Sequence, residues 1–509
     1  MPNENIAADL IASVTTPVDV PHVIAGAPRR EGTEFLRENP SHPTQVVSKA
    51  YAATQELVQE AVDASRAAQR AWSRVPVSER AAKVRAGIDY VNGNVDAWAL
   101  RAALETGKPW NDAKVEALET LQFLEIYPSY VTEEGYFEDP RQQDGDDHYT
   151  SGAVLNASVL RPYGVFGVIT PFNYPGALAS GPAIAAVLAG NGVVIKTSSL
   201  APWTGLAVYE MFEAMDLPAG LVNVIHGGGK ELVATDVDGI AFTGSAETGK
   251  LIAQTINDGP YPRPFIAEMG GKNPLIVTDT ANLEQAADAI IYSAFHLTGQ
   301  KCSALSRVLV DAGSHEKLVE LLSARINTFT LGAPEQDADL GPVINEGAVR
   351  KYKEILQQAK AEGFAYWQAR NGATEGYFVS PLLIAGVPAN HPLAREEHFL
   401  PVVTISPVEG FEQAITEANA SEYGLTAGIF TGEAAEAEEF LHLIEAGCVN
   451  VNIDGHATSG WWPGPQTFGG WKGSGSTGIQ GFGKWYVQQF MRQQARKVPQ
   501  NLRELLSKV

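Results

Sequence analysis

The sequence predicts an α/β fold with two parallel-sheet domains and a small β arm. Short β-rich runs alternate with helical segments between residues 164 and 245, and a second alternating series lies between residues 265 and 452. Such alternation is typical of βα units around a parallel sheet. A chain of 509 residues also exceeds the length that one hydrophobic core usually serves. We therefore predict two large domains.

The remaining elements follow in chain order. Residues 55–130 carry apolar side chains at three- and four-residue spacing, which predicts helices. Residues 136–160 are polar and aromatic and predict an extended arm, which the basic, amphipathic C-terminal segment completes. The predicted boundaries are 1–138 and 159–272 for the first domain, 273–450 for the second, 451–484 for a return segment, and 139–158 and 485–509 for the arm.

Composition argues against two classes of partner. The chain has 37 Lys and Arg residues against 59 Asp and Glu, a net charge of −22, and no basic stripe that would indicate nucleic-acid binding. Residues 162–195 lack charged side chains over a length that could cross a membrane. Prolines, asparagines and glycines interrupt this run, so we interpret it as strand, loop, helix and strand of a buried core.

Only two cysteines occur, Cys302 and Cys448. Two cysteines in so long a chain argue against a disulfide framework and a thiolate metal site, and they favour a reducing compartment. The N-terminus shows no export signal, so we expect a cytoplasmic protein without a metal. Cys302 follows a Gly-Gln turn and a lysine, where positive charge and backbone N–H groups favour the thiolate. Cys448 lies in an apolar, strand-like run and is interpreted as a core residue.

Glu268 is a candidate general base. It ends an apolar strand and precedes Gly270 and Gly271, which allow tight backbone. A carboxylate that emerges from an apolar strand can have a raised pKa and accept a proton near neutral pH. Taken alone, it is equally a carboxylate at the solvated end of a strand.

Asn173 is a candidate donor to an oxyanion. Pro171 and Pro175 flank it, so its backbone is stiff and its side-chain amide is held in one direction. Together with the backbone N–H of Cys302, such an amide can stabilise a tetrahedral oxyanion by about 3–4 kcal/mol. By itself, Asn173 is also typical of a turn between prolines.

Residues 242–250, FTGSAETGK, indicate a site for a phosphate. They follow a strand and open a helix, whose N-terminus favours negative charge. Gly244 allows close backbone approach, and Ser245 can donate its hydroxyl. Gly249 follows after four intervening residues, which differs from the usual G-x-G-x-x-G spacing, so the motif is weak by itself.

Three further residues have side chains suited to a dinucleotide. Lys196 ends a strand, where its ammonium group can meet ribose hydroxyls or a phosphate. Glu397 offers a carboxylate for a ribose, and Phe399 offers a ring for a nicotinamide face. Each alone is equally a surface charge or a core aromatic residue.

Seven motifs together resemble the aldehyde dehydrogenase superfamily. They are PFNYP at 171–175, KTSS at 196–199, FTGS at 242–245, EMGGKNP at 268–274, GQKCSA at 299–304, EEHFLPV at 396–402 and FGGWKGSG at 468–475. They occur in the family's order and near its spacing, from about residue 50 to 500 of the chain. The resemblance implies a Rossmann-type cofactor domain, a second α/β catalytic domain and a small β oligomerisation arm.

The resemblance also implies roles for individual residues. Cys302 attacks the aldehyde, Asn173 stabilises the oxyanion, and Glu268 activates the water that hydrolyses a thioester. The implied contacts to NAD or NADP are Ile169, Lys196, Ser199, Gly244, Ser245, Gly249, Glu397 and Phe399. The arm implies a homodimer or a dimer-based tetramer.

Within the superfamily, GQKCSA followed by LSR resembles the branch that oxidises L-glutamate γ-semialdehyde, the 1-pyrroline-5-carboxylate dehydrogenases. In that branch Lys301 and Ser303 help to hold the substrate carboxylate, and a loop at Gly460 completes the anchor. Trp461 departs from the Ser or Ala that is usual there. Its indole is expected to occupy substrate volume or to redirect the loop.

The substrate and the coenzyme therefore stay open between alternatives. Tyr174 and Phe468 are expected to form walls for the aliphatic part of a substrate. That substrate is glutamate semialdehyde, another carboxylated or medium-length semialdehyde, or an apolar or aromatic aldehyde. Ser199 replaces a Glu that many relatives use to repel a 2′-phosphate, so NADP is an alternative to NAD. A non-catalytic structural homologue is the remaining alternative, although the nucleophile, base and oxyanion donor are all present.

Overall fold

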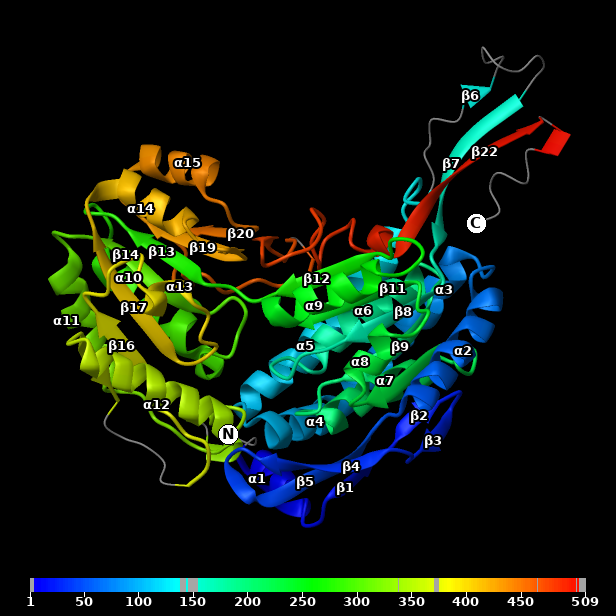
Figure 1. Ribbon diagram of the computed structural model, residues 1–509, viewed down its shortest axis with the longest axis horizontal. Coiled ribbons are helices and arrows are strands. Elements are labelled where there is room, and N and C mark those ends of the chain that lie inside the picture. The colour runs from blue at the N-terminus through cyan, green and yellow to red at the C-terminus, as the bar shows by residue number, and fades with distance from the viewer. Residues whose placement is uncertain are drawn as a thin grey trace.

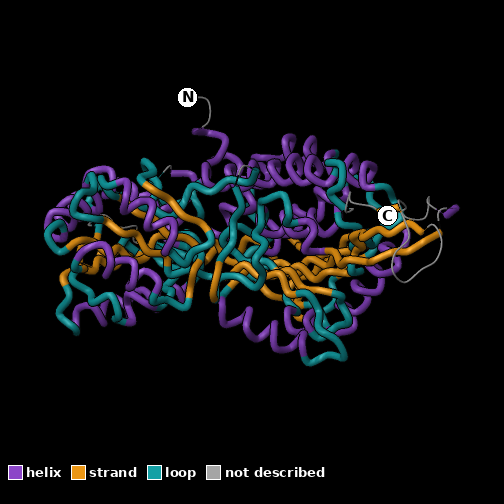
Figure 2. Tube along the Cα trace, turned by 90° about the horizontal axis from the view of Figure 1, so that it is seen from above, coloured by secondary structure: helices purple, strands orange, loops and turns teal. Residues whose placement is uncertain are grey.

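The computed structural model describes residues 4–137, 143–144, 154–336, 338–369, 375–464, 466–499 and 501–502. Two large sheets lie in two lobes, and a β ribbon projects from the lobe that contains the first sheet (Figure 1). Viewed from above, helices cover both faces of the strands (Figure 2). The predicted α/β architecture is confirmed.

The first sheet has seven strands. In spatial order they are β12 (Phe265–Met269), β11 (Gly239–Gly244), β8 (Val165–Ile169), β9 (Gly192–Thr197), β10 (Val222–His226), β2 (His22–Ile24) and β3 (Ala27–Arg29). The first five are parallel, and β2 joins β10 in the antiparallel direction. From β8 the chain builds β9 and β10 on one side, then β11 and β12 on the other. Ligands of open α/β sheets bind beside the carboxyl ends of the strands at such a reversal.

Helices cover both faces of this sheet. They are α2 (Gln55–Trp72), α3 (Val77–Arg85), α4 (Gly87–Thr106), α5 (Trp110–Val131), α6 (Ala177–Leu188), α7 (Pro202–Glu213), α8 (Gly229–Val233) and α9 (Ala246–Asn257), with α1 (Glu4–Ser13) beside α4. One core contains Phe123, Ile184 and Val193, and another contains Val58 and Ile240. The uncharged run of residues 162–195 forms β8, α6 and β9 of this buried core, as predicted. Among the described residues, no helix has the length and apolarity needed to cross a membrane.

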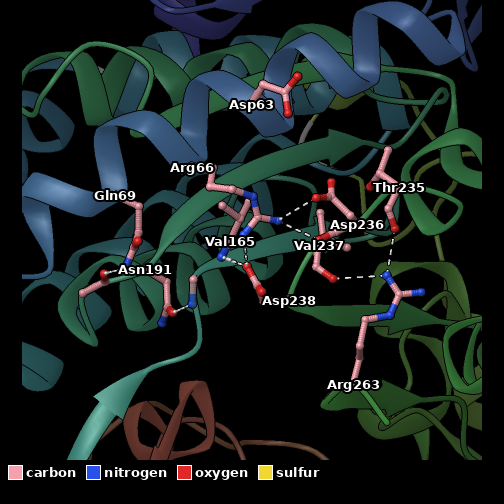
Figure 3. Close-up of polar contacts among 12 residues, drawn as sticks. Asp63, Arg66, Gln69, Val165, Asn191, Thr235, Asp236, Val237, Asp238 and Arg263 are labelled. Carbon is pink, nitrogen blue, oxygen red and sulfur yellow. Dashed lines mark hydrogen bonds and ion pairs between the residues drawn. The ribbon is translucent and has the colours of Figure 1, made fainter. Parts of the chain in front are cut away.

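Polar contacts fix the amino ends of the central strands (Figure 3). Arg66 of α2 donates to Asp238 at 2.6 Å, and the same Asp238 oxygen accepts the backbone N–H of Val165, the first residue of β8, at 2.8 Å. Arg263 donates to the carbonyl of Thr235 at 2.8 Å. These bonds lie at the end of the sheet opposite the carboxyl ends of the strands, and they leave the latter free for a ligand.

The second sheet also has seven strands. In spatial order they are β15 (Ala365–Gln368), β16 (Leu382–Ala385), β17 (Val402–Val408), β14 (Leu305–Asp311), β13 (Asn273–Val277), β19 (Thr426–Phe430) and β20 (Cys448–Val451). All pairs except β15–β16 are parallel. Its helices are α10 (Leu283–Phe295), α11 (His315–Ile326), α12 (Glu346–Ala361), α13 (Pro392–Arg395), α14 (Gly410–Asn419) and α15 (Ala434–Leu443), with the 3-10 turns η1 (His296–Gly299) and η2 (Pro334–Gln336).

Smaller sheets complete the fold. They are β1 (Val18–Val20) with β5 (His42–Ala52) and β4 (Thr33–Asn39), β18 (Tyr423–Gly424) with β21 (Trp471–Lys472), and the ribbon of β6 (Gln143–Asp144), β7 (Val154–Pro162) and β22 (Met491–Pro499). Strand β7 continues to Pro162, past the arm boundary predicted at residue 158. Val487 and Phe490 of η3 (Val487–Phe490) are buried in the core of the first lobe, so the segment before β22 differs from the predicted arm.

Candidate active site

A cavity of about 430 Å³ lies at the carboxyl ends of β8, β9, β11 and β12. The second lobe closes it with a loop that carries Cys302 and with residues 351, 397 and 399. The structure places these predicted residues in its wall: Ile169, Asn173, Lys196, Gly244, Ser245, Glu268, Cys302, Glu397 and Phe399. It therefore brings the candidate nucleophile, base and oxyanion donor together with most of the candidate coenzyme contacts.

A second, smaller pocket of about 70 Å³ lies on the other side of Cys302. Cys302 and Asn173 line both cavities. All of the residues predicted to contact substrate are in the wall of this pocket: Tyr174, Lys301, Ser303, Gly460, Trp461 and Phe468. A reacting group in this pocket would therefore meet the thiol from one side and a ligand of the large cavity from the other.

The backbone of Cys302 is held from strand β13. Asn273 donates its amide to the carbonyl of Cys302 at 2.7 Å and to that of Ala304 at 2.8 Å. A Cβ atom at Gly271 would lie 2.7 Å from the Cys302 carbonyl oxygen, so glycine is needed for this close approach. The motif EMGGKNP thus supports the nucleophile loop as well as carrying the base.

The Cys302 thiol and the Glu268 carboxyl line the same cavity, and each shifts the pKa of the other. Burial raises the pKa of Glu268 to about 7, with the nearby Cys302 lowering it and the charge of Glu397 raising it further. Burial and the nearby Glu268 also raise the pKa of Cys302, whereas Lys301 lowers it. The thiol therefore retains its proton at rest, and the Glu268 carboxylate is the adjacent group that can accept it. Oε1 of Glu268 is buried without a hydrogen-bond partner among the described residues, so it can still accept a hydrogen bond from water.

The strand that carries Glu268 is an edge strand, and the return segment fixes it. The N–H of Met269 donates to the carbonyl of Ser474 at 2.9 Å, and that of Ala267 donates to Oγ of Ser476 at 2.7 Å. Ser474 also donates its hydroxyl to the carbonyl of Gly270 at 2.6 Å. Ser474 of the motif FGGWKGSG and Ser476 just after it thus hold the strand of the candidate base from outside the sheet.

Asn173 is held through its backbone. The ammonium group of Lys108 donates to the Asn173 carbonyl at 2.7 Å and forms an ion pair with Glu116, and both of these side chains are buried. Glu116 accepts the backbone N–H groups of Gly176 at 2.6 Å and of Ala177 at 3.2 Å, where α6 begins. The loop between β8 and α6 is thereby fixed on both sides of Asn173, and the residue lines both cavities.

The large cavity fits a dinucleotide at its phosphate end. Ser245 caps α9, with its hydroxyl accepting the N–H of Thr248 at 3.2 Å, and both residues line the cavity. The N-terminus of α9 therefore presents its positive end to the cavity. Lys196 lies in the same wall, and burial lowers its pKa to about 8. A phosphate group would stabilise the charged form of this lysine.

The other end of the cavity fits a ribose and an aromatic ring. Oε1 of Glu397 accepts the N–H of Gly271 at 2.9 Å, and a Cβ atom at Gly270 would lie 2.1 Å from its other oxygen, so only glycine leaves room for this carboxylate. Phe399 has a left-handed φ of +56° and contacts Phe172 edge-on at 5.8 Å. A non-glycine residue in this region is strained, which is typical of functional sites.

Comparison with known proteins leads to the same family as the geometry. The model of the aldehyde dehydrogenase family matches residues 28–495. The chain belongs to the aldehyde dehydrogenase family. It is therefore an oxidoreductase that acts on aldehydes.

Two relatives and one solved structure cover nearly the whole aldehyde dehydrogenase chain. This chain is 32% identical over 471 residues to a 1-pyrroline-5-carboxylate dehydrogenase of Geobacillus kaustophilus, and the alignment covers 90% of this chain and 89% of the relative. It is 33% identical over 450 residues to an α-ketoglutaric semialdehyde dehydrogenase of Bacillus subtilis, and this alignment covers 86% of this chain and 89% of the relative. The structure of a 1-pyrroline-5-carboxylate dehydrogenase from Thermus with bound NAD is similar to this one, with a TM-score of 0.89 and 28% sequence identity. The similarity covers 97% of this chain and 96% of the Thermus chain.

Two predicted coenzyme contacts of this aldehyde dehydrogenase do not line the cavity. Ser199 is exposed in the turn after β9, and its neighbour Ser198 lines the cavity instead. Gly249 lies inside α9, where a Cβ atom would be 2.4 Å from the sulfur of Met269. Gly249 therefore allows α9 to approach β12 closely, which is a packing role.

Sequence reasoning missed two charged residues of the site. Glu119 of α5 lines the smaller pocket, where burial and the charge of Glu116 raise its pKa to about 8. The available signal was two carboxylates on the same face of α5 as the buried Thr120 and Phe123. Lys351 of α12 lines the large cavity and donates to two carbonyls, that of Glu397 at 3.1 Å and that of residue 398 at 2.9 Å. Its surroundings in the sequence are those of an ordinary surface lysine.

Proposed function

We propose that this enzyme oxidises L-glutamate γ-semialdehyde to glutamate with NAD, through a covalent thioester on Cys302. One observation carries the proposal: Cys302 lies where a dinucleotide-sized cavity meets a pocket with polar and aromatic walls. The Glu268 carboxyl, with a pKa of about 7, lines the same cavity and raises the pKa of the thiol.

The mechanism assigns one task to each residue. Glu268 accepts the thiol proton, and Cys302 attacks the aldehyde carbon to form a thiohemiacetal. The Asn173 amide and the backbone N–H of Cys302 stabilise the oxyanion. Bound NAD supplies the hydride acceptor that converts the thiohemiacetal to a thioester. Glu268 releases the thiol proton to solvent and then removes a proton from water, so that the resulting hydroxide attacks the thioester. The carboxylic acid leaves, and Glu268 returns the second proton to the departing thiolate.

The charges of the smaller pocket favour glutamate semialdehyde, which carries a carboxylate and an ammonium group. Lys301 and Glu119 are both in the wall, so the pocket has one basic and one acidic side chain; a bound ammonium group would stabilise the carboxylate form of Glu119, whose pKa is about 8. Lys301 and Ser303 are positioned to bind the carboxylate, and Glu119 to bind the ammonium group. The names of the two relatives, 1-pyrroline-5-carboxylate and α-ketoglutaric semialdehyde dehydrogenase, also describe substrates that carry a carboxylate.

The aromatic walls of the same pocket favour a second candidate, an apolar or aromatic aldehyde. Tyr174, Trp461, Phe468 and Phe482 all line it. The Trp461 indole donates to the carbonyl of Thr458 at 3.3 Å, so the ring is held in the wall rather than turned away.

For the coenzyme, NAD is proposed first and NADP is the alternative. The similar Thermus enzyme was solved with NAD. Ser199 is exposed beside the cavity wall and lacks the carboxylate that would repel a 2′-phosphate. A ratio of kcat/KM with NADP to that with NAD well above one would reverse this order.

An aldehyde panel tests the proposal. The purified enzyme is assayed with NAD and with NADP on glutamate, succinate and α-ketoglutarate semialdehydes, and on benzaldehyde and butanal. We expect the highest kcat/KM with glutamate semialdehyde and NAD, and no turnover by Cys302→Ala, whose coenzyme binding is kept. A higher kcat/KM with benzaldehyde would favour the second candidate, and no reaction with any aldehyde would favour a non-catalytic homologue.

The assembly proposed is a homodimer, or a tetramer built from dimers, in the cytoplasm. Strand β20 is an edge strand of the second sheet, and the ribbon of β7 and β22 projects away from its own lobe (Figure 1). An edge strand and a projecting ribbon are complementary surfaces between two copies of one chain. Both cysteines are free, and the mechanism needs the Cys302 thiol in its reduced form, which favours a reducing compartment.

A further inference from the structure

A hydrogen-bonded chain of three side chains runs from α5 to the nucleophile loop. Nε2 of His296 lies 2.8 Å from a carboxylate oxygen of Asp112, and Nδ1 of the same ring lies 3.3 Å from the ammonium nitrogen of Lys301. A carboxylate next to Nε2 favours the tautomer with the proton on that nitrogen, so Nδ1 is free to accept from Lys301. Lys301 directly precedes Cys302.

The His296 ring is held from two directions. Tyr292 of α10 stacks on it with 4.8 Å between ring centroids and an interplanar angle of 20°. The backbone after it is unusual, because Leu297 and Thr298 have φ of +54° and Gly299 has φ of +66°. Three consecutive left-handed residues turn the chain sharply, and strain of this kind persists where the surrounding structure enforces it.

Bonds to a neighbouring loop hold this turn in place. Thr298 donates its hydroxyl to the carbonyl of Gly341 at 2.9 Å, and the side-chain oxygen of Gln300 accepts the N–H of Ile344 at 2.9 Å. As a result, His296 and Lys301 lie side by side although α10 has already ended.

Lys301 is a cation without a permanent counter-ion. Among the described residues, His296 is its hydrogen-bond partner, and it forms no ion pair. It lies 5.7 Å from the ring centroid of Tyr174 in the pocket wall. Burial lowers its pKa, while Asp112, Cys302 and Glu119 raise it and Lys108 lowers it. An ammonium group has three donors, and a buried cation is costly without an anion, so a substrate carboxylate would complete this site.

Building on the proposed function, we infer that Asp112 and His296 are positioning residues for Lys301. They hold its ammonium group in the wall of the substrate pocket, and His296 thereby sets the preference for aldehydes with a carboxylate over neutral aldehydes of the same length. Without the acceptor at Nδ1, the flexible stem of Lys301 is free to turn toward Glu119 or Cys302. The cation would then have to be reoriented each time a substrate binds.

The test compares succinate semialdehyde with butanal, which has four carbons and no carboxylate. In His296→Phe the ring that stacks on Tyr292 is kept and the acceptor is lost. We expect its ratio of kcat/KM for succinate semialdehyde to that for butanal to fall about tenfold, mainly through KM, because a charge-assisted contact of about 1.4 kcal/mol is lost. In His456→Phe, a ring that also contacts Tyr292 but has no bond to Lys301 is changed, and we expect the ratio to stay at the wild-type value.

Two further variants make the result specific. In His296→Gln the amide oxygen can replace the ring nitrogen as the acceptor for Lys301, so we expect most of the preference for succinate semialdehyde over butanal to be retained. This variant carries the test if His296→Phe does not fold. Combining His296→Phe with Lys301→Met should lower the ratio no further than Lys301→Met alone, because both changes remove the same interaction.

The possible failures are distinguishable. Equal losses for both aldehydes in His296→Phe, a ratio unchanged from wild type, or a wild-type enzyme without preference for succinate semialdehyde would each overturn the positioning role. Continued oxidation of glutamate semialdehyde would leave the proposed function standing in those cases. If the wild type oxidised no aldehyde at all, the proposed function would fail, and this inference with it.

Discussion

At the scale of single residues, the environment of Glu268 would set the pH range of the proposed reaction. Burial raises the pKa of this carboxyl to about 7, so the carboxylate that accepts protons forms only as the pH passes through neutrality. Because the pKa of Glu268 is higher in the folded protein than in the unfolded chain, the folded protein binds this proton more tightly. Ionisation of Glu268 therefore lowers the free energy of unfolding as the pH rises.

The first prediction follows from that pKa. We expect kcat to fall as the pH decreases below about 7, with Glu268 protonated and the thioester no longer hydrolysed. Glu268→Gln should form the thioester more slowly than the wild type, because the acceptor of the thiol proton is lost, and should then stall after about one NADH per site. Stopped-flow absorbance at several pH values measures both phases, and unchanged steady turnover in the variant would remove Glu268 from the role of base.

The second prediction concerns Trp461, whose indole lines the substrate pocket and bonds to Thr458. Trp461→Ser removes this wall and enlarges the pocket. We expect kcat/KM for glutamate semialdehyde to change at least several-fold, with a loss for benzaldehyde because its aromatic contact disappears. The neighbouring Trp462 does not line the pocket, so Trp462→Ser is the control. Equal values for wild type and Trp461→Ser on both aldehydes would show that the indole does not contact substrate.

At the scale of elements, the loop before α6 depends on a buried ion pair between Lys108, which precedes α5, and Glu116 of α5. Lys108 holds the carbonyl of Asn173, and Glu116 caps the beginning of α6. Removing one member leaves the other as an uncompensated buried charge, which typically costs about 3–5 kcal/mol.

The third prediction compares Lys108, which lies just before α5, with Lys114, which lies within α5. We expect Lys108→Met to lower the free energy of unfolding by about 3 kcal/mol and to reduce kcat through displacement of Asn173. Lys114 pairs with Asp96 at 2.7 Å on a partly exposed surface, so Lys114→Met should cost less than about 1 kcal/mol. Urea unfolding and steady-state kinetics measure both effects. Wild-type stability in Lys108→Met would contradict the structural role of the pair.

The same elements show what the sequence could predict. Strands β8, β9, β10 and β11 lie where the apolar runs predicted them, because parallel strands buried on both faces need continuous apolar residues. The candidate site residues that lie on short motifs, such as Cys302 and Asn173, could be proposed from the sequence for the same local reason. Glu119 and Lys351 were missed because helices α5 and α12 bring them to the site from distant parts of the chain, and helical periodicity does not report which helix faces which cavity. His296 became visible only through its contacts with Asp112 and Lys301.

At the scale of the whole molecule, the ribbon is the part that the single chain explains least. Strand β22 pairs with β7 over nine positions from Met491–Pro162 to Pro499–Val154, yet most of its side chains after Met491 are exposed. A ribbon of two or three strands is marginally stable alone in water, because little apolar surface is buried. The homodimer proposed above would cover this ribbon with a second copy of the chain.

The fourth prediction is that the assembly depends on β22. Deletion of residues 491–509 removes β22 from one side of β7, and we expect the protein to run as a monomer in size-exclusion chromatography with light scattering. Deletion of residues 503–509 keeps β22 and should leave the number of subunits in the assembly as in the wild type. In a second variant, Gln493→Pro with Ala495→Pro, the strand keeps its length but loses backbone donors, so it should behave as the longer deletion does. If both β22 variants kept the wild-type number of subunits, other surfaces would hold the subunits together. The exposed ribbon would then have to be stable without a partner.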